Sequence, residues 1–191
     1  RERTSKPFGV NLMLMNPETE KMVDIVCEEK VPVVTTGAGN PGAYMERFKA
    51  AGILVIPVVA APILAKHLER IGADAVIAEG CESGGHIGEM TTMTLIPQTV
   101  DAVDIPVIAA GGIADHRQMQ AVLTLGACGA QIGTALLAAE ECPIHEYYKE
   151  AVLKAQGSDT IVTGRIGGTP VRVLKNQMSR EYVKREKAGE D

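Results

Sequence analysis

The chain has 191 residues, of which 46% are hydrophobic, and its formal net charge is -5. This is enough apolar material for one buried core but not for two compact domains, so we expect a single globular domain. The excess of acidic over basic residues argues against nucleic acid as the main partner. Apolar stretches such as residues 53–64 contain prolines and are shorter than the roughly 20 residues of a membrane-spanning helix, so no membrane segment is expected.

The cysteines give an expectation about the cellular compartment. The four of them lie far apart and form no C-x-x-C pair. This spacing favours a reducing cytoplasm over a disulfide scaffold or a zinc site. The first six residues are charged but have no apolar segment behind them, which argues against a signal peptide. We therefore expect a cytoplasmic protein.

Short apolar runs recur along the chain, each followed by a segment with helical spacing. They begin near Phe8, Val31, Ile53, Asp74, Pro106 and Cys128. Most steps between them span 21 to 23 residues, the length of a strand, a helix and two loops. Several runs are apolar throughout, as strands buried on both faces are, so the predicted sheet is parallel.

Helices are predicted between these strands, over residues 18–29, 43–51, 63–71, 99–103 and 115–125. Asp115 precedes an apolar-periodic stretch and is the predicted N-cap of its helix. The step from Asp74 to Pro106 is about ten residues longer than its neighbours, and the excess falls in residues 80–92, directly after a strand. In a parallel barrel this end of the strands is the catalytic face.

Six such units predict most of a TIM (β/α)8 barrel, an α/β fold that typically needs about 250 residues. Barrels often hold phosphate at the loops after strands 7 and 8. The two strand ends richest in glycine lie on consecutive strands, so the six strands are assigned to positions 3 to 8. Residues 1–191 are then one domain that we expect to be truncated at both ends. A doubly wound open sheet is the alternative.

Two glycine-marked turns are candidate phosphate cradles. Gly111 and Gly112 lie between a buried strand and a predicted helix start. Gly133 and Thr134 have the same form on the next strand, with a hydroxyl added. Glycine lets the backbone approach an anion closely, and a helix N-terminus supplies N–H donors. Either turn alone could be a tight connection without a ligand, but two adjacent ones favour a ligand.

The histidine in the long loop is the candidate catalytic residue. His86 stands among the glycines of residues 84–88, at the predicted catalytic face. Imidazole exchanges a proton near neutral pH, and flanking glycines let a flat ring or a substrate come close. A loop histidine that only bonds a carbonyl is the alternative. The remaining histidines lie on helical or helix-start segments and are interpreted as solvated: His67, His116 and His145.

Polar residues inside apolar strands are further candidates. Asn11 and Gln131 either bond neighbouring backbone or face a ligand at the barrel mouth, because a buried amide needs partners. Glu79 ends its strand, where a ligand hydroxyl, a backbone N–H or a cation should meet the carboxylate. Cys81 is not expected to be a nucleophile, since no third group is evident near its closest histidine. The basic segment 172–187 is interpreted as a solvated helix face.

These residues resemble the flavin-dependent enoyl-acyl carrier protein reductase II family, a relative of the nitronate monooxygenases. The blocks that carry the resemblance span nearly the whole chain, and they are residues 8–11, 34–41, 78–80, 84–88, 91–95, 106–114 and 175–177. The segments 34–41 and 91–95 are similar to the reductases in particular. The glycine-methionine segment that opens family members has no counterpart here, as the missing strands 1 and 2 predict.

The resemblance implies FMN as cofactor, NAD(P)H as hydride donor and a trans-2-enoyl-acyl carrier protein as acceptor, in bacterial type II fatty acid synthesis. It implies that the FMN phosphate is held by Gly111, Gly112, Gly133 and Thr134. Residues lining the ribityl chain or the flavin ring are Asn11, Glu79, Gly84, Gly85 and Gln131. The resemblance implies that His86 stands beside the flavin where the substrate enters. His86, or a water that it orders, is the candidate proton donor to the enolate.

The resemblance also implies activation by a monovalent cation, with the backbone around Asn176 as a candidate site, and it leaves a homodimer open. Three other functions stay open at this stage. A nitronate monooxygenase would oxidise alkyl nitronates with O2 and need no nicotinamide. A flavin-free phosphate-binding barrel would be colourless. A non-catalytic barrel would bind a ligand without turnover.

Overall fold

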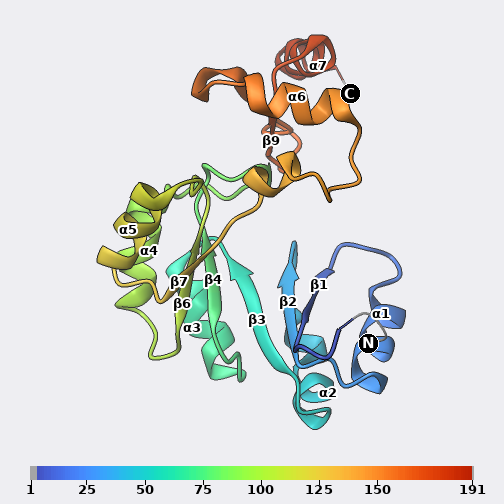
Figure 1. The fold of residues 1–191 in the computed structure, drawn as a ribbon, viewed down its shortest axis with the longest axis vertical. Coiled ribbons are helices and arrows are strands. Elements are labelled where there is room, and N and C mark those ends of the chain that lie inside the picture. Colours follow the sequence, from blue (N-terminus) through green and yellow to red (C-terminus); the bar gives the residue numbers. More distant parts are fainter. Residues whose placement is uncertain (1–3, 191) are drawn as a thin grey trace.

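The structure, a computed structural model, describes residues 4–190, so the outermost positions of the predicted 1–191 domain lie outside it. Its centre is a curved sheet of parallel strands (Figure 1). Every strand start predicted above is confirmed to within a few residues. The strands are β1 (Gly9–Met13), β2 (Val33–Gly37), β3 (Leu54–Val59), β4 (Val76–Glu79), β6 (Val107–Ala110) and β7 (Gly129–Gln131).

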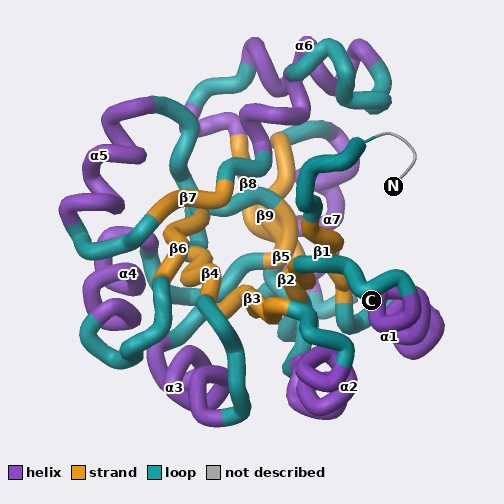
Figure 2. Tube along the Cα trace, turned by 60° about the horizontal axis from the view of Figure 1, so that its bottom comes forward, coloured by secondary structure: helices purple, strands orange, loops and turns teal. Residues whose placement is uncertain are grey.

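The strand order distinguishes between the two folds that repeated strand–helix units can form. Neighbours in the sheet follow the order of the chain, β1-β2-β3-β4-β6-β7, and every pair is parallel. A doubly wound sheet reverses its order and carries helices on both faces. Here the helices surround the outer face (Figure 2), so the sheet is a half-barrel, an incomplete TIM barrel. These helices are α1 (Thr19–Glu28), α2 (Met45–Ala50), α3 (Pro62–Arg70), α4 (Thr92–Val100) and α5 (His116–Thr124).

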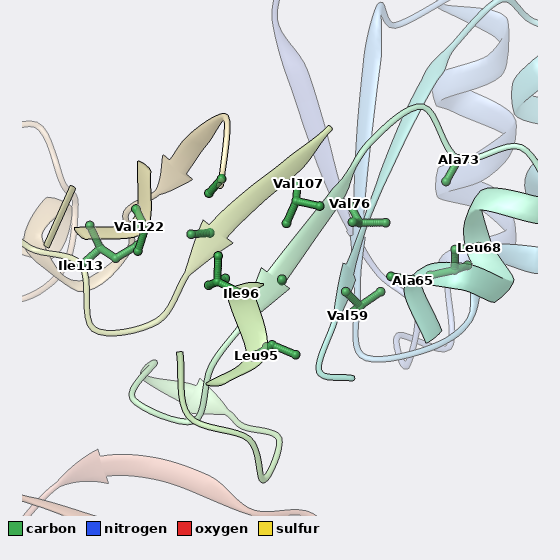
Figure 3. Packing of buried hydrophobic residues seen from close by; sticks show 13 residues of the cluster. Val59, Ala65, Leu68, Ala73, Val76, Leu95, Ile96, Val107, Ile113 and Val122 are labelled. Atoms are coloured by element: carbon green, nitrogen blue, oxygen red, sulfur yellow. The ribbon is translucent and has the colours of Figure 1, made fainter. Parts of the chain in front are cut away.

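Apolar side chains fill the layer between the sheet and these helices. In the middle of the half-barrel, Val59, Val76 and Val107 on the strands pack with Leu95 and Ile96 of α4 (Figure 3). A second cluster of the same kind joins β1, β2 and β3 to α1 and α2. Burying one such side chain contributes about 1.5–3 kcal/mol relative to leaving it exposed. This layer therefore holds the strand ends in place.

One predicted helix was wrong in its bounds. The structure has α4 at Thr92–Val100, whereas the sequence pattern predicted a helix over residues 99–103. Pro97 lies inside α4, and proline usually interrupts a helix because it lacks an N–H. The carbonyl left without that donor belongs to Met93, an exposed residue of the first turn, where water can replace the bond.

The C-terminal part of the chain lies over the carboxyl ends of the parallel strands (Figure 1). Its strands β8 and β9 join β5, from the loop after β4, in an antiparallel sheet of order β5-β9-β8 that the sequence pattern did not predict. Within the described range, no helix is long and apolar enough to cross a membrane. β5 is Gly85–His86, and the elements of the C-terminal part are η2 (Thr134–Ala138), α6 (Glu146–Lys154), η3 (Gly157–Asp159), β8 (Thr160–Thr163), β9 (Val171–Leu174) and α7 (Gln177–Ala188).

Candidate functional site

The first glycine turn follows β6 and touches the end of β4. Gly111 and Gly112 have φ of +95° and +73°, in the region that favours glycine. A Cβ on Gly111 would lie 2.5 Å from the carbonyl oxygen of Gly80, so only glycine allows these two strand ends to meet. Gly112 is exposed. Gly111 is therefore required for packing, whereas Gly112 is the exposed glycine of the turn.

The second glycine turn follows β7 and begins η2. Gly133 and Thr134 are both exposed, and a Cβ on Gly133 would meet no atom within 4 Å. A Cβ on Gly84 would lie 3.3 Å from the Thr134 hydroxyl oxygen, so the loop that carries His86 reaches this turn. The structure thus brings the predicted phosphate-binding residues and the predicted catalytic loop together.

The start of α5 is occupied by its own side chains. Asp115 is the N-cap, as predicted, and accepts a hydrogen bond from the Arg117 N–H at 2.8 Å. The Gln118 side chain accepts from the N–H groups of Ala114 and Asp115. Hydrogen bonds from the Arg117 side chain lower the pKa of Asp115 to about 2. An anion would therefore be bound by the preceding glycine turn and not by the first N–H groups of α5.

Polar side chains on the inner face of the half-barrel lie next to these turns. The register places Glu79 beside Ala110 and Ala110 beside Gln131, so the two polar residues flank a methyl group in one layer. Burial raises the pKa of Glu79. The Ser83 hydroxyl is close enough to oppose this shift, although it is not aligned for a hydrogen bond. This layer is suited to a ligand that offers hydroxyl groups.

His86 is exposed and lies on β5, a strand of two residues that pairs with β9. The predicted loop is thus partly a strand, and a distant segment holds it. Arg172 of β9 donates two hydrogen bonds to the carbonyl oxygen of Cys81, at 2.9 and 3.2 Å. The interpretation of residues 172–187 as one solvated helix face was therefore wrong at its start, where the chain forms β9.

Two residues of the site were missed by sequence reasoning. The carboxylate of Glu82 accepts hydrogen bonds from the Thr92 N–H at 2.9 and 3.1 Å, at the start of α4. The Thr92 hydroxyl lies 2.8 Å from the carbonyl oxygen of Gly111. Thr92 therefore connects the His86 loop to the first glycine turn. A carboxylate ten residues before a helix start has no local sequence signature, so only the fold could reveal it.

Cys81 lies in the same loop. Burial and the neighbouring Glu82 raise the pKa of its thiol, and Arg172 opposes them. A raised pKa leaves little reactive thiolate near neutral pH. This agrees with the expectation that Cys81 is not a nucleophile.

Asn11 and Asn176 lie apart from this group. Asn11 is on β1, at the opposite edge of the sheet from β7, and its side chain accepts a hydrogen bond from Thr35 at 2.9 Å. The Asn176 side chain accepts from the Ser179 N–H and caps α7. In residues 4–190, no three His, Cys, Asp or Glu side chains are placed to share a metal ion. The monovalent cation near Asn176 stays a prediction.

Two hollows on the surface lie elsewhere. One is lined by residues 4–8 and Pro32, at the opposite end of the strands, and the other lies between α3 and α4. Neither includes a predicted site residue. The candidate site is thus an open surface at the carboxyl ends of β4, β6 and β7, beneath the antiparallel sheet.

Comparison with a library of protein families matches residues 18–189 to the model described as nitronate monooxygenase. A solved structure of FabK from Thermotoga maritima is 52% identical, with a TM-score of 0.95, over 97% of this chain and 60% of that one. Nitroalkane oxidase from Streptomyces ansochromogenes is 32% identical, with a TM-score of 0.84, over 93% of this chain and 64% of that one.

A curated relative from Rhodococcus jostii is 39% identical over 92% of this chain and 50% of its own length. Its name is (3aS,4S,5R,7aS)-5-hydroxy-7a-methyl-1-oxo-octahydro-1H-indene-4-carboxyl-CoA dehydrogenase. The chain thus spans about half the length of this relative.

Proposed function

This chain belongs to the nitronate monooxygenase family, and within that family we propose that it forms part of an FMN-dependent enoyl-acyl carrier protein reductase. The observation that carries the proposal is the 52% identity to FabK, an enoyl-acyl carrier protein reductase II, along nearly the whole chain. Identity to the nitroalkane oxidase and to the CoA dehydrogenase is lower, at 32% and 39%. The proposed reaction is reduction of a trans-2-enoyl thioester by NAD(P)H.

The residues present fit a flavin mononucleotide. Gly112 and Gly133 are exposed glycines at adjacent strand ends, and the missing side chain at Gly133 leaves open space beside Thr134. Because the Glu82 side chain lies against Gly112, an anionic phosphate is expected nearer to Gly133 and Thr134. Glu79 and Gln131 would then meet the ribityl hydroxyls or the polar edge of the ring.

A bound flavin supplies the hydride transfer between nicotinamide and thioester, and the chain supplies position and charge. The small sheet holds His86 over the carboxyl ends of the strands, where barrels place their reacting groups. From there the imidazole orients the thioester, or gives a proton to its α-carbon once hydride has reached the β-carbon. Glu79, with its raised pKa, favours a hydroxyl partner over open solvent.

Nitronate oxidation is the second candidate, because the matching family model carries that name. If the substrate is supplied as the neutral nitroalkane, the same exposed His86 would remove the proton beside the nitro group to form the nitronate. The two reactions differ in their partners, since the oxidation uses O2 and no nicotinamide.

Cofactor release and turnover assays on the full-length protein distinguish these two reactions. We expect it to be yellow, to release FMN on denaturation, and to consume NAD(P)H when a crotonyl thioester is added without oxygen. Oxygen uptake with an alkyl nitronate and no NAD(P)H oxidation would establish the monooxygenase instead. A colourless protein that FMN cannot reconstitute would exclude both flavin reactions.

The cofactor site is tested by a pair of glycine variants. Gly112→Ala and Gly52→Ala each force an alanine into a positive φ, +73° and +72°, at a cost of about 1–2 kcal/mol. Gly52 lies at the end of α2 with open space around it, away from the site. Gly112→Ala should lose more thermal stability than Gly52→Ala, because its Cβ would lie 3.0 Å from the Glu82 Cβ. We expect loss of bound FMN only in Gly112→Ala, measured by absorbance of the folded protein at equal concentration.

A further inference from the structure

The loop that carries His86 is joined to the half-barrel on both sides of the histidine. The Glu82 carboxylate accepts hydrogen bonds from Thr92, and Gly88 lies against Ala60. Between Cys81 and Ile87 its regular structure is β5, which pairs with β9 over two residues. The Ile87 N–H extends this pairing by donating to the Pro170 carbonyl at 3.1 Å. Gly84 and Gly85 precede the histidine, and Gly85 has a φ of +82°, so the backbone here has little intrinsic stiffness. The position of His86 therefore depends on how β9 is held.

Arg172 supplies the side-chain contact between β9 and this loop. It is half-buried and lies opposite Gly85 in the strand register. Its Nε and Nη2 atoms donate to the carbonyl oxygen of Cys81, and its Nη1 donates to the Thr160 hydroxyl on β8 at 3.1 Å. One planar guanidinium thus connects the first residue of the loop with two strands of the antiparallel sheet.

We propose that Arg172 is a positioning residue, which holds the His86 loop over the strand ends by tying the Cys81 carbonyl to the antiparallel sheet. The inference deepens the proposed function and rests on it for the role of His86. Hydrogen bonds from a charged donor are stronger than neutral ones, and the partners are 91 residues apart in the chain. The loop therefore has an anchor outside the half-barrel, in addition to the hydrogen bonds between Glu82 and Thr92.

Arg165 offers a matched control. It lies between β8 and β9, and its Nη1 contacts the same loop at Glu89, 3.4 Å away. The side chain is 53% exposed, so this ion pair is worth little. Arg165→Met and Arg172→Met remove the same charge from the same region, but only the second removes the bonds to Cys81.

The first experiment follows amide hydrogen exchange in the full-length protein as purified, without substrate. We expect Arg172→Met to speed exchange of residues 82–88 by about tenfold or more, because two charge-assisted hydrogen bonds are lost. Exchange in β1 to β3 should not change, and Arg165→Met should behave as wild type. Equal exchange in the two variants would overturn the proposal, and so would faster exchange throughout the half-barrel. This result does not depend on which reaction the protein catalyses.

The second experiment separates the two half-reactions by anaerobic stopped flow. Arg172→Met should retain FMN and its reduction by NAD(P)H, and slow reoxidation by a crotonyl thioester about tenfold or more. Arg172→Lys keeps the positive charge but not the planar guanidinium that bonds Cys81 and Thr160 at once, so it should recover only part of the rate. Equal slowing of both half-reactions, or full recovery by lysine, would overturn the positioning role. If even the wild type reduces no thioester, the proposed function fails. The hydrogen-exchange result still tests whether Arg172 holds the loop that carries His86.

Discussion

Burial raises the pKa of Glu79, so the folded protein disfavours the charged form of this side chain. In the unfolded chain the carboxyl titrates near 4.5. Because the folded pKa is the higher one, the stabilising contribution is complete below about pH 4.5 and is lost as the pH rises through the folded value. At neutral pH Glu79 therefore costs stability, which is common for residues kept for ligand binding.

Glu79→Gln should accordingly raise the melting temperature of the flavin-free protein at pH 7. The expected gain is at most about 1 kcal/mol, since the carboxyl is partly solvated. The gain should shrink as the pH is lowered and disappear below about pH 4.5. Thermal melts across this range, with the exposed Glu46→Gln as control, measure it. A gain that persisted at pH 3.5 would assign the effect to packing and not to charge.

His86 is the proposed catalytic residue, and its variant separates a role in catalysis from a role in cofactor binding. It is exposed and held on β5, so removing its ring should leave the half-barrel intact. We expect His86→Ala to retain FMN and reduction by NAD(P)H, while reoxidation by an enoyl thioester slows by roughly 10²-fold or more. Anaerobic stopped flow measures both steps, with the exposed His67→Ala on α3 as control. Unchanged reoxidation would remove His86 from the mechanism.

At the scale of elements, helix starts position the site. The N-terminus of α4 binds the Glu82 carboxylate, and that of α5 is closed by the capping box of Asp115 and Gln118. Both helices begin directly beneath the glycine turn after β6. Carboxylates at these helix starts also offset the positive end of each helix dipole. The N–H groups at both helix starts are therefore bonded to side chains of the protein itself.

The charge of Asp115 should affect the stability of the protein at acid pH. Its folded pKa is about 2, below its unfolded value of 3.8, so its contribution is complete above about pH 4 and is lost as the pH falls through 2. Asp115→Asn keeps the capping oxygen but not the charge. The wild type should be the more stable protein at pH 7, and the difference should narrow from pH 4 to 2.5 in urea unfolding. Arg117→Met should weaken the dependence of stability on pH in the same range. If its stability depends on pH as that of the wild type does, the hydrogen bond from Arg117 is not the cause of the lowered Asp115 pKa.

At the scale of the molecule, the half-barrel has two open edges and a partly open inner face. Among residues 4–190, β1 and β7 each pair with one strand of the large sheet only. Inner-face side chains such as Met13 and Leu54 are 44% and 50% exposed. Unpaired edges beside exposed apolar surface promote association.

Residues 1–191 expressed alone are therefore expected to be poorly soluble or molten. Light scattering after size exclusion should reveal aggregates, and dye binding should report exposed apolar surface. The same measurements on the full-length protein provide the comparison. A monomeric fragment that melts cooperatively with FMN bound would show that this expectation is wrong.

Local pattern was sufficient to predict the parallel sheet, its six strand starts and the helix cap at Asp115. Each of these depends on periods and signals within about 20 residues, which a sequence carries directly. The gathering of Gly112, Gly133 and Glu79 also followed, because the carboxyl ends of parallel strands meet at one edge.

Only the tertiary structure revealed the antiparallel sheet, the link from Arg172 to Cys81 and the contact between Glu82 and Thr92. A strand of two residues has no period to detect, and a side chain that bonds a carbonyl 91 residues away leaves no local signal. The start of α4 was missed for the opposite reason. Pro97 is a local signal against a helix, but the burial of Leu95 and Ile96 stabilises the helix around it. Long-range contacts therefore decided how the loop that carries His86 is held.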